Sequence, residues 1–184
     1  MKNVVIIGGG TGLSVMLRGM KNIKDVQLSA VVTVADDGGS TGRIRNVMCA
    51  MAEEEGLFAE LMNYRFGGEG DIAGHNLGNL LLLALSQTTG SFMEAIRTFS
   101  RVLKVKGRII PSTLEVVTLF AMMEDGTIVR GEDNIPKFRN HIDRVFYQRD
   151  IKATEESLTA IREADLIIYG IGSLYTSIMP NLII

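Results

Sequence analysis

The stretch VVIIGGGTG, residues 4–12, decides the fold, because an apolar, β-branched run leads directly into a glycine-rich loop. Such a run predicts a strand buried on both faces, over residues 3–7. Glycines let the backbone turn sharply and approach a ligand closely, and the N–H groups at the start of the next helix, expected over Thr11–Met20, attract anions. The loop Gly9, Gly10, Thr11 and Gly12 therefore predicts a phosphate site, with a tight turn that binds nothing as the alternative.

The strict dinucleotide fingerprint is not met by this loop. Gly8 and Gly10 fit the G-x-G-x-x-G spacing, but Leu13 occupies the third glycine position. No lysine follows the glycines as it does in a Walker A loop. A phosphate or sugar-phosphate site is favoured, and dinucleotide binding is weakened.

A second apolar strand, expected over residues 28–34, runs into the loop ADDGGSTGR at residues 35–43. An acid at the end of the second strand often holds a ribose or another ligand hydroxyl, and Asp36 has that position. Asp36 and Asp37 together are also suited to holding Mg²⁺ against a phosphate. A helix cap or a turn within the loop is the alternative for either carboxylate. Gly38, Gly39 and Ser40 complete this loop as candidate ligand contacts.

Two arginines, Arg43 and Arg45, follow that loop closely. Guanidinium groups bind phosphates in a fixed, bidentate geometry. The alternative for both side chains is a solvated surface.

The stretch GHNLGNL, residues 74–80, places three polar side chains at the start of an apolar helix, expected over Leu77–Gln87 and buried on most sides. His75, Asn76 and Asn79 are costly there unless they are satisfied. A ligand at the positive end of the helix would satisfy them, and so would helix capping.

A third loop of the same kind, GIGSLYTS at residues 170–177, follows a strand expected over residues 165–169. Parallel strands end at one edge of a sheet, so this loop is expected to share a crevice with the first two. Its backbone N–H groups and hydroxyls are candidate ligand contacts, Tyr175 is a candidate for stacking on a base or sugar, and a helix-capping turn is the alternative. The candidates are Gly172, Ser173, Tyr175, Thr176 and Ser177.

The rest of the chain predicts alternating strands and helices, interrupted by a β-rich region. Residues 46–62 are expected to be helical, Ser91 and Glu94 form a capping box for a helix to residue 103, and Thr154 begins a helix to residue 164. Residues 108–130 and 142–147 are rich in β-formers, with an Asp-Gly turn at residues 125–126. The pattern predicts an α/β fold: a Rossmann-like, doubly wound and mostly parallel sheet with a β-rich hairpin insertion. We expect a single nucleotide-binding α/β domain over residues 1–184, with the β-rich subregion at about residues 108–147.

Composition excludes several classes of protein. The formal net charge of the 184 residues is −2 and no basic tract exists, which disfavours a nucleic-acid polymer as partner. The single cysteine, Cys49, excludes a disulfide within the chain and a cysteine-based zinc cluster. The longest near-continuous apolar run, residues 80–85, is too short for a membrane span, and the apolar start is too short for a signal peptide. A cytoplasmic protein is expected.

Five motifs occurring in this order strongly resemble the YvcK/CofD-like family, and more narrowly its YvcK branch of gluconeogenesis factors. They are IIGGGTG at 6–12, VADDGGSTGR at 34–43, GHNLGNL at 74–80, NIPK at 134–137 and GSLYTS at 172–177. The resemblance implies a Rossmann-like nucleotide-binding fold, UDP-sugar binding (notably UDP-N-acetylglucosamine), and a regulatory role that links carbon flux to cell-wall precursors and cell shape. It implies no required cofactor. In the CofD branch it implies transfer of 2-phospholactate with Mg²⁺, for which Asp36 and Asp37 would be the metal ligands.

The chain departs from the family pattern in three places. About ten residues are expected between Arg45 and Asn46 but are absent, the chain ends where the family continues for a second half, and Ile171 replaces a usual proline. The chain is therefore expected to be truncated relative to the family.

Three functions remain open from the sequence. The first is a UDP-sugar-binding regulator, expected to form a homo-oligomer and to act through a protein partner rather than as a catalyst. The second is a CofD-like, Mg²⁺-dependent transferase, in which the metal neutralises phosphate charge. The third is an NAD(P)-binding oxidoreductase.

Overall fold

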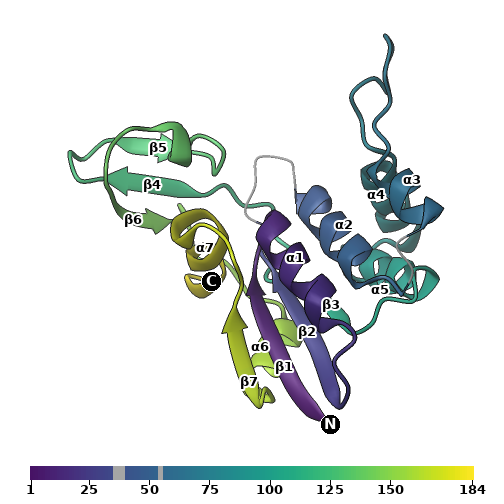
Figure 1. The fold of residues 1–184 in the computed structure, drawn as a ribbon. Helices are drawn as coiled ribbons and strands as arrows, with labels where there is room; N and C mark the ends of the chain where they lie inside the picture. Colours follow the sequence, from purple (N-terminus) through teal and green to yellow (C-terminus); the bar gives the residue numbers. More distant parts are fainter. Residues whose placement is uncertain (35–39, 54–55) are drawn as a thin grey trace.

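The computed structural model describes residues 1–34, 40–53 and 56–184 (Figure 1). Its main sheet has four parallel strands in the order β3-β2-β1-β7. β1 pairs with β2 along its whole length and with β7 on its other side. The strands are β1 (Lys2–Gly8), β2 (Val26–Val32), β3 (Arg108–Pro111) and β7 (Leu166–Tyr169). β1, β2 and β7 confirm predicted strands with small shifts of their ends; β1 and β2 are buried over most of their length, while β7 is mostly exposed.

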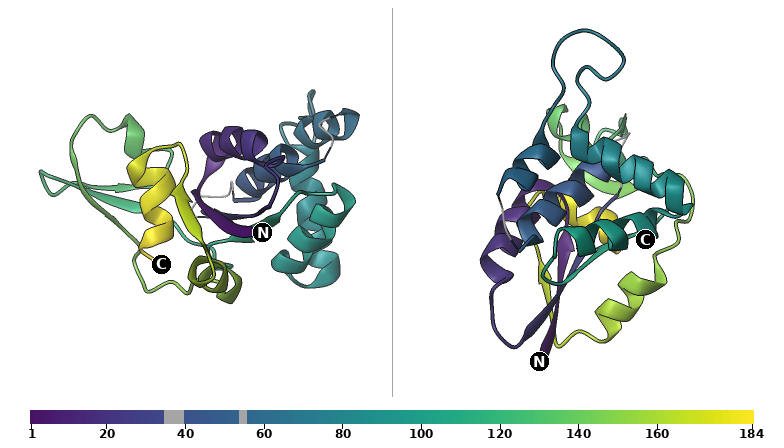
Figure 2. Two further views of the ribbon diagram at one scale, coloured as in Figure 1. Left: turned by 60° about the horizontal axis from the view of Figure 1, so that its bottom comes forward. Right: turned by 90° about the vertical axis from the view of Figure 1, so that its right-hand side faces the viewer.

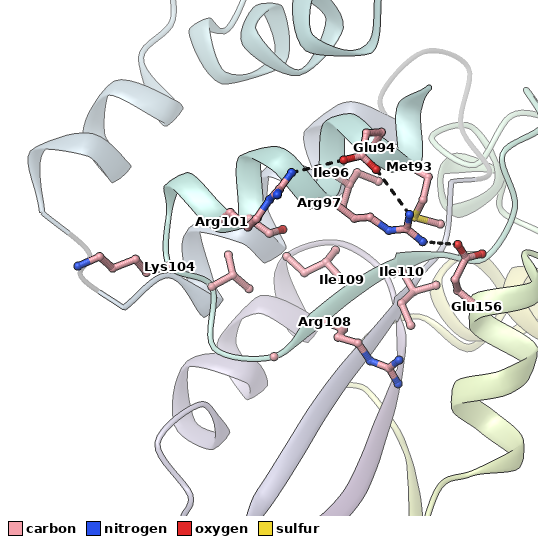
Figure 3. Close-up of a pocket in the computed structure, with 13 residues that line it drawn as sticks. Met93, Glu94, Ile96, Arg97, Arg101, Lys104, Arg108, Ile109, Ile110 and Glu156 are labelled. Carbon is pink, nitrogen blue, oxygen red and sulfur yellow. Dashed lines mark hydrogen bonds and ion pairs between the residues drawn. The ribbon is translucent and has the colours of Figure 1, made fainter. Parts of the chain in front are cut away.

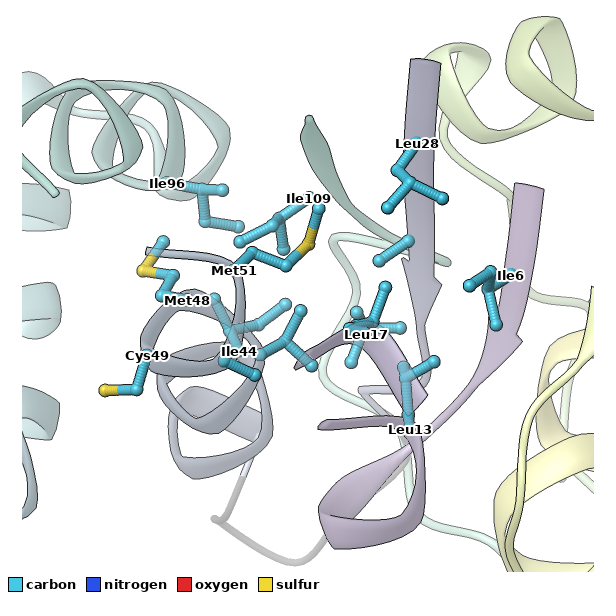
Figure 4. Close-up of a cluster of buried hydrophobic side chains, with 14 of the residues drawn as sticks. Ile6, Leu13, Leu17, Leu28, Ile44, Met48, Cys49, Met51, Ile96 and Ile109 are labelled. Carbon is cyan, nitrogen blue, oxygen red and sulfur yellow. The ribbon is translucent and has the colours of Figure 1, made fainter. Parts of the chain in front are cut away.

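Helices cover both faces of this sheet, as the doubly wound prediction requires. On one face, alternate strand residues such as Ile6 and Leu28 pack against α1 (Gly10–Met20), α2 (Ser40–Met51) and α5 (Phe92–Val102) in one cluster (Figure 4). On the other face, residues such as Val5 and Val31 pack against α6 (Glu155–Arg162). The alternation follows from the twofold period of a strand, which sends successive side chains to opposite faces.

The single helix predicted over residues 46–62 is wrong, because two helices occupy that region. α2 ends at Met51, whose carbonyl oxygen accepts a hydrogen bond from Lys106 N at 2.8 Å. α3 (Leu57–Asn63) starts afresh after Gly56, which has an extended backbone. α2 itself continues without a break through Arg45 and Asn46, where the family pattern suggested absent residues.

α4 (Leu77–Thr89) begins where the sequence predicts, but the prediction that it is buried on most sides is wrong. Only Gly78 and Leu82 are buried, while Leu81 and Leu83 are 36% and 50% exposed. α4 packs against α2, α3 and α5, and its remaining face lies at the outside of the molecule (Figure 1). The segment 64–76, between α3 and α4, projects from the body (Figure 2).

A separate antiparallel sheet follows, in the order β5-β4-β6. Its strands are β4 (Phe120–Met123), β5 (Ile128–Arg130) and β6 (Ile142–Phe146), with a short helix η1 (Ile135–Lys137) after β5. The Asp-Gly turn joins β4 to β5 as predicted, and Gly126 has a φ of 82° there. The β-rich region begins later than predicted, because β3 pairs in parallel with β2 and belongs to the main sheet.

The last residues return to the antiparallel sheet. After β7 the chain forms the short helices η2 (Leu174–Ile178) and α7 (Met179–Leu182). Tyr175, Met179 and Ile183 pack against the apolar side chains of that sheet. The Tyr147 hydroxyl donates to the Pro180 carbonyl at 2.9 Å, which joins β6 to α7. No helix in the described part of the chain is long and apolar enough to cross a membrane.

Candidate functional site

The strand order places a topological switch point between β1 and β7. β1 leads through α1 to β2 on one side, and β7 lies on its other side. Ligands of open α/β sheets bind outside the carboxyl ends of the strands at such a point. The loops after β1 and β7 both lie there, as the sequence predicts.

Gly9, Gly10 and Gly12 of the first loop are each required to be glycine for a different geometric reason. A Cβ on Gly9 would overlap the Thr33 side chain, and a Cβ on Gly12 would overlap the Ile171 carbonyl oxygen. Gly10 has a φ of +69°, and no atom of the described residues lies within 4 Å of the place of a Cβ. Gly9 and Gly12 therefore allow close packing of β1 on β2 and of α1 on the β7 loop, whereas Gly10 supplies the left-handed turn.

The first turn of α1 has properties of an anion site. Its N-cap residue, Gly9, makes no side-chain cap, and the first turn holds no acidic residue. The first N–H groups of a helix have no partner within the helix and carry the positive end of its dipole. Thr11 is exposed in this turn. These features agree with the phosphate contact predicted for this loop, which stays a prediction.

The loop after β7 is arranged around a helix cap, which was the alternative prediction for it. The Ser173 hydroxyl accepts from Thr176 N at 3.3 Å. A Cβ on Gly172 would lie 2.9 Å from the Ser177 side chain, so the loop folds tightly on itself. Tyr175 packs on the antiparallel sheet, and its predicted stacking on a base or sugar stays a prediction.

Two of the three polar residues at the start of α4 form hydrogen bonds with other groups of the protein. Asn76 is buried, and its side-chain oxygen caps α4 by accepting from Asn79 N at 3.1 Å. Asn79 Oδ1 accepts from Arg45 Nη1 at 3.1 Å. His75 is exposed. The capping interpretation is thus confirmed for Asn76, and ligand contacts of His75, Asn76 and Asn79 stay predictions.

Neither arginine after the second loop is a solvated surface residue. Arg43 is buried and forms an ion pair with Glu132, which follows β5. Arg45 is half-buried, bonds both Asn46 and Asn79, and has its pKa lowered chiefly by desolvation. A Cβ on Gly9 would lie 3.8 Å from Arg43 Nη1. Arg43 thus lies between the glycine loop and the antiparallel sheet.

Glu132 and Tyr147 are site neighbours that the sequence reasoning missed. Glu132 Oε2 is buried and has no hydrogen-bond partner in the structure. Burial raises the pKa of Tyr147, while the nearby Arg43 charge opposes that shift. Glu132 is 89 positions from Arg43 in the sequence, and no helix or strand period predicts a contact over that separation.

A fourth hydroxyl-bearing loop, which the sequence reasoning also missed, follows β3. Ser112 and Thr113 are buried, and Thr113 Oγ1 donates to the Lys152 carbonyl at 2.7 Å. Ser112 Oγ is buried, and none of the residues that the structure describes forms a hydrogen bond with it. The signal was present, since a serine and a threonine directly follow an apolar strand in the stretch RIIPST at residues 108–113.

Four predicted site residues, Asp36, Asp37, Gly38 and Gly39, lie outside the described residues, and Ser40 begins α2. Within the described ranges, no group of three or more His, Cys, Asp or Glu side chains is placed to hold a metal ion. The Mg²⁺ prediction for Asp36 and Asp37 therefore stays a prediction.

Known proteins resemble this chain closely. The family model described as 2-phospho-L-lactate transferase CofD matches residues 4–184. The gluconeogenesis factors of Listeria monocytogenes and Bacillus subtilis are both 48% identical over 194 residues, with 98% of this chain covered and 60% and 61% of theirs. A crystal structure of a UPF0052 family member from Bacillus halodurans superposes with a TM-score of 0.92 at 47% identity, covering all of this chain and 63% of that one.

Two facts about length follow from these matches. The chain spans about 60% of the length of the curated relatives it matches. The aligned stretch of 194 residues also exceeds the 184 residues of this chain, so the relatives carry additional residues within it. Since the match covers nearly the whole chain at a high identity, the chain belongs to the CofD/UPF0052 family, which includes the gluconeogenesis factors.

Proposed function

We propose that this protein binds a UDP-sugar of the UDP-N-acetylglucosamine type at the switch point and acts as a regulator of the gluconeogenesis-factor kind. In this role it links carbon metabolism to the supply of cell-wall precursors and to cell shape, without a required cofactor. The observation that carries the proposal is the contact between the loops after β1 and β7, where Gly12 packs against Ile171 beside the uncapped N-terminus of α1.

The chemistry of the crevice suits a nucleoside diphosphate sugar. The first turn of α1 offers N–H groups to the diphosphate, with Gly10 providing room for close approach. Arg43 lies next to Gly9 on the same side, where its charge is balanced by Glu132. The sugar and nucleoside hydroxyls would meet Asp36 or Asp37 and the loop after β7.

A second candidate is a CofD-like transferase, which the description of the family model favours. In that case Asp36 and Asp37 would hold Mg²⁺ against a phosphate. The third candidate, an NAD(P)-dependent oxidoreductase, gains no support. Leu13, at the third glycine position of the dinucleotide fingerprint, is fully buried in the core.

The deciding experiment is a thermal-shift titration of the full-length protein with UDP-N-acetylglucosamine, UDP, GTP and NADPH, each with Mg²⁺ and with a chelator. A ligand that binds only the folded state raises the unfolding midpoint. We expect the UDP-sugar to raise the unfolding midpoint equally with Mg²⁺ and with the chelator. In Asp37→Asn, the shift should likewise be the same with and without Mg²⁺. A shift that needs Mg²⁺ and disappears in Asp37→Asn would instead establish the transferase, and a shift with NADPH alone the oxidoreductase.

We also place the protein in the cytoplasm, as a homo-oligomer that acts on a protein partner. Light scattering coupled to size-exclusion chromatography tests the oligomer, and a monomeric mass at micromolar concentration would refute it.

A further inference from the structure

We propose a second small-molecule site, for an organic anion with an apolar body, in a cavity of about 530 Å³ between α5 and β3 (Figure 3). Cavities that bind small ligands typically measure roughly 300–1,000 Å³. β3 is the edge strand on the far side of β2 from the switch point, and none of the residues of the loops after β1 and β7 lines the cavity. The site is therefore separate from the proposed UDP-sugar site, and its test does not depend on that proposal.

The walls facing each other across the cavity are apolar. Ile96 of α5 lies opposite Ile109 of β3, whereas Ile110 borders the cavity from the other face of the strand (Figure 3). All three side chains are part of the core and at most 5% exposed. Such walls favour a hydrocarbon chain or ring, because its burial removes apolar surface from water.

Charged groups at the cavity make an anion the favoured kind of ligand. Four cationic side chains line the cavity against two carboxylates, those of Glu94 and Glu156. Arg97 joins these two, with Nη2 at 2.7 Å from Glu156 Oε1 and Nη1 at 3.5 Å from Glu94 Oε2. Lys104, at the opposite end in Figure 3, pairs with Glu53 at 3.8 Å. Arg101 also pairs with Glu94, at 3.4 Å, so the four cations exceed the three carboxylates Glu94, Glu156 and Glu53 by one charge. The Lys104–Glu53 pair is longer than the pairs of Glu94 and its Lys104 side chain is 77% exposed, so a carboxylate or phosphate group of the ligand would bind at this end.

One residue of the wall has an unpaired buried hydroxyl, and another has a strained backbone. The Ser100 hydroxyl is buried and has no hydrogen-bond partner among residues 1–34, 40–53 and 56–184. Lys104 has a φ of +47° in a helix-terminating motif, with Val105 N donating to Ser100 O at 2.9 Å and Lys104 N to Arg101 O at 3.1 Å. Glycine is the usual residue at that position, so a lysine there strains the backbone.

An extended peptide is a poorer occupant than a small molecule. Ser112 N donates to Val32 O, so Pro111, one residue earlier in the parallel ladder, faces the open edge of the sheet. Proline has no N–H, and it interrupts the row of donors that an added strand would need.

The test uses methyl NMR of the full-length protein labelled at isoleucine, titrated with octanoate, octan-1-ol, octylamine and inorganic phosphate. We expect octanoate to shift the methyl signals of Ile96, Ile109 and Ile110 and to leave those of Ile6 and Ile178 unchanged. Octan-1-ol, octylamine and phosphate each lack one of the two required features and should bind at least about tenfold more weakly. Equal shifts with octan-1-ol, or with phosphate alone, would overturn the proposal, as would octanoate shifts confined to other isoleucines.

Two variants separate binding from folding. Lys104→Gly relieves the backbone strain and should not lower the unfolding midpoint, yet should weaken octanoate binding about tenfold. Ser100→Ala removes the unpaired hydroxyl, with the same expected combination of intact stability and weaker binding. Lys106→Ala is the matched control, because Lys106 bonds Asn22 and does not line the cavity. Unchanged octanoate affinity in both Lys104→Gly and Ser100→Ala would refute the site.

Discussion

Gly12 in the first turn of α1 packs directly against the carbonyl group of Ile171 in the loop after β7, and a Cβ at Gly12 would overlap that oxygen. The two positions are distant in sequence, but the strand order brings them together because β7 pairs with β1. The same contact aligns the two loops at the switch point. Gly12 therefore serves the geometry of the site without needing to touch a ligand.

Gly12→Ala is expected to destabilise the fold by about 1 to 3 kcal/mol, since the clash is with backbone and must be relieved by moving a loop. Gly19→Ala is the matched control in the same helix. Nothing lies within 4 Å of its Cβ position, so alanine there should stabilise by up to about 1 kcal/mol. Urea unfolding measures both, and equal effects of the two variants would show that Gly12 is not in a close contact.

The ion pair between Arg43 and Glu132 predicts strong coupling between α2 and the antiparallel sheet. Both side chains are largely buried, with 10% and 14% of their surface exposed. Removing one partner leaves a buried charge, so Arg43→Met and Glu132→Leu should each cost about 3 to 5 kcal/mol.

The double variant should cost clearly less than the two single variants together, because it leaves neither charge unpaired. Urea unfolding of the four proteins gives the coupling. Additive losses would mean that the two side chains stabilise the fold independently.

Strand periods and glycine loops predicted the main sheet well, because a buried parallel strand has a strong local signature. The runs around Ile6, Val31 and Ile168 are continuous and β-branched, and each ends in a glycine or hydroxyl loop. β3 was assigned to the β-rich insertion, since an apolar strand looks the same in either sheet until its partner is known.

Apart from the single helix predicted over residues 46–62, the incorrect predictions concern partners rather than elements. α4 is apolar on all sides, and composition alone cannot say that Leu81 and Leu83 lie on an uncovered face. Glu132 entered no motif, because its importance comes from Arg43, which is distant in sequence. The capping role of Asn76 was foreseeable, because a cap is local to one turn.

The pair of Lys2 and Asp165 predicts a pH dependence of stability at the other end of β1. Lys2 Nζ donates to Asp165 Oδ1 at 2.7 Å, and Asn3 N donates to Oδ2 at 2.8 Å. The Lys2 hydrogen bond, followed by that of Asn3, holds the pKa of Asp165 below its ordinary value of 3.8, and Asp165 raises the pKa of Lys2 above 10.5.

The carboxylate stabilises the fold above pH 3.8, and this contribution is lost as the pH falls through its lowered folded-state pKa. The lysine contributes below pH 10.5 and loses its contribution as the pH rises through its raised pKa. Asp165→Asn should flatten the acid limb of a plot of the unfolding midpoint against pH. Asp150→Asn, at an exposed position outside the sheet, serves as the control. An unchanged acid limb in Asp165→Asn would show that the pair does not contribute to the pH dependence of stability.

Gly10 and Gly90 offer a matched test of the proposed phosphate site. Their φ values are 69° and 70°, and within the described part of the chain no atom lies within 4 Å of either Cβ position. Gly10 begins α1 at the switch point. Gly90 ends α4, which packs against α2, α3 and α5. Alanine at either position should therefore cost the same backbone strain, about 1 to 2 kcal/mol, in urea unfolding.

Only Gly10→Ala should weaken binding of UDP-N-acetylglucosamine, by about tenfold or more, because its methyl group occupies the space that the diphosphate approaches. Isothermal titration calorimetry of the two variants beside the parent protein measures this directly. Equal affinities in all three proteins would place the diphosphate elsewhere, while equal losses in both variants would attribute the effect to lowered stability rather than to the loop. The comparison is decisive because the two substitutions differ in position and not in conformational cost.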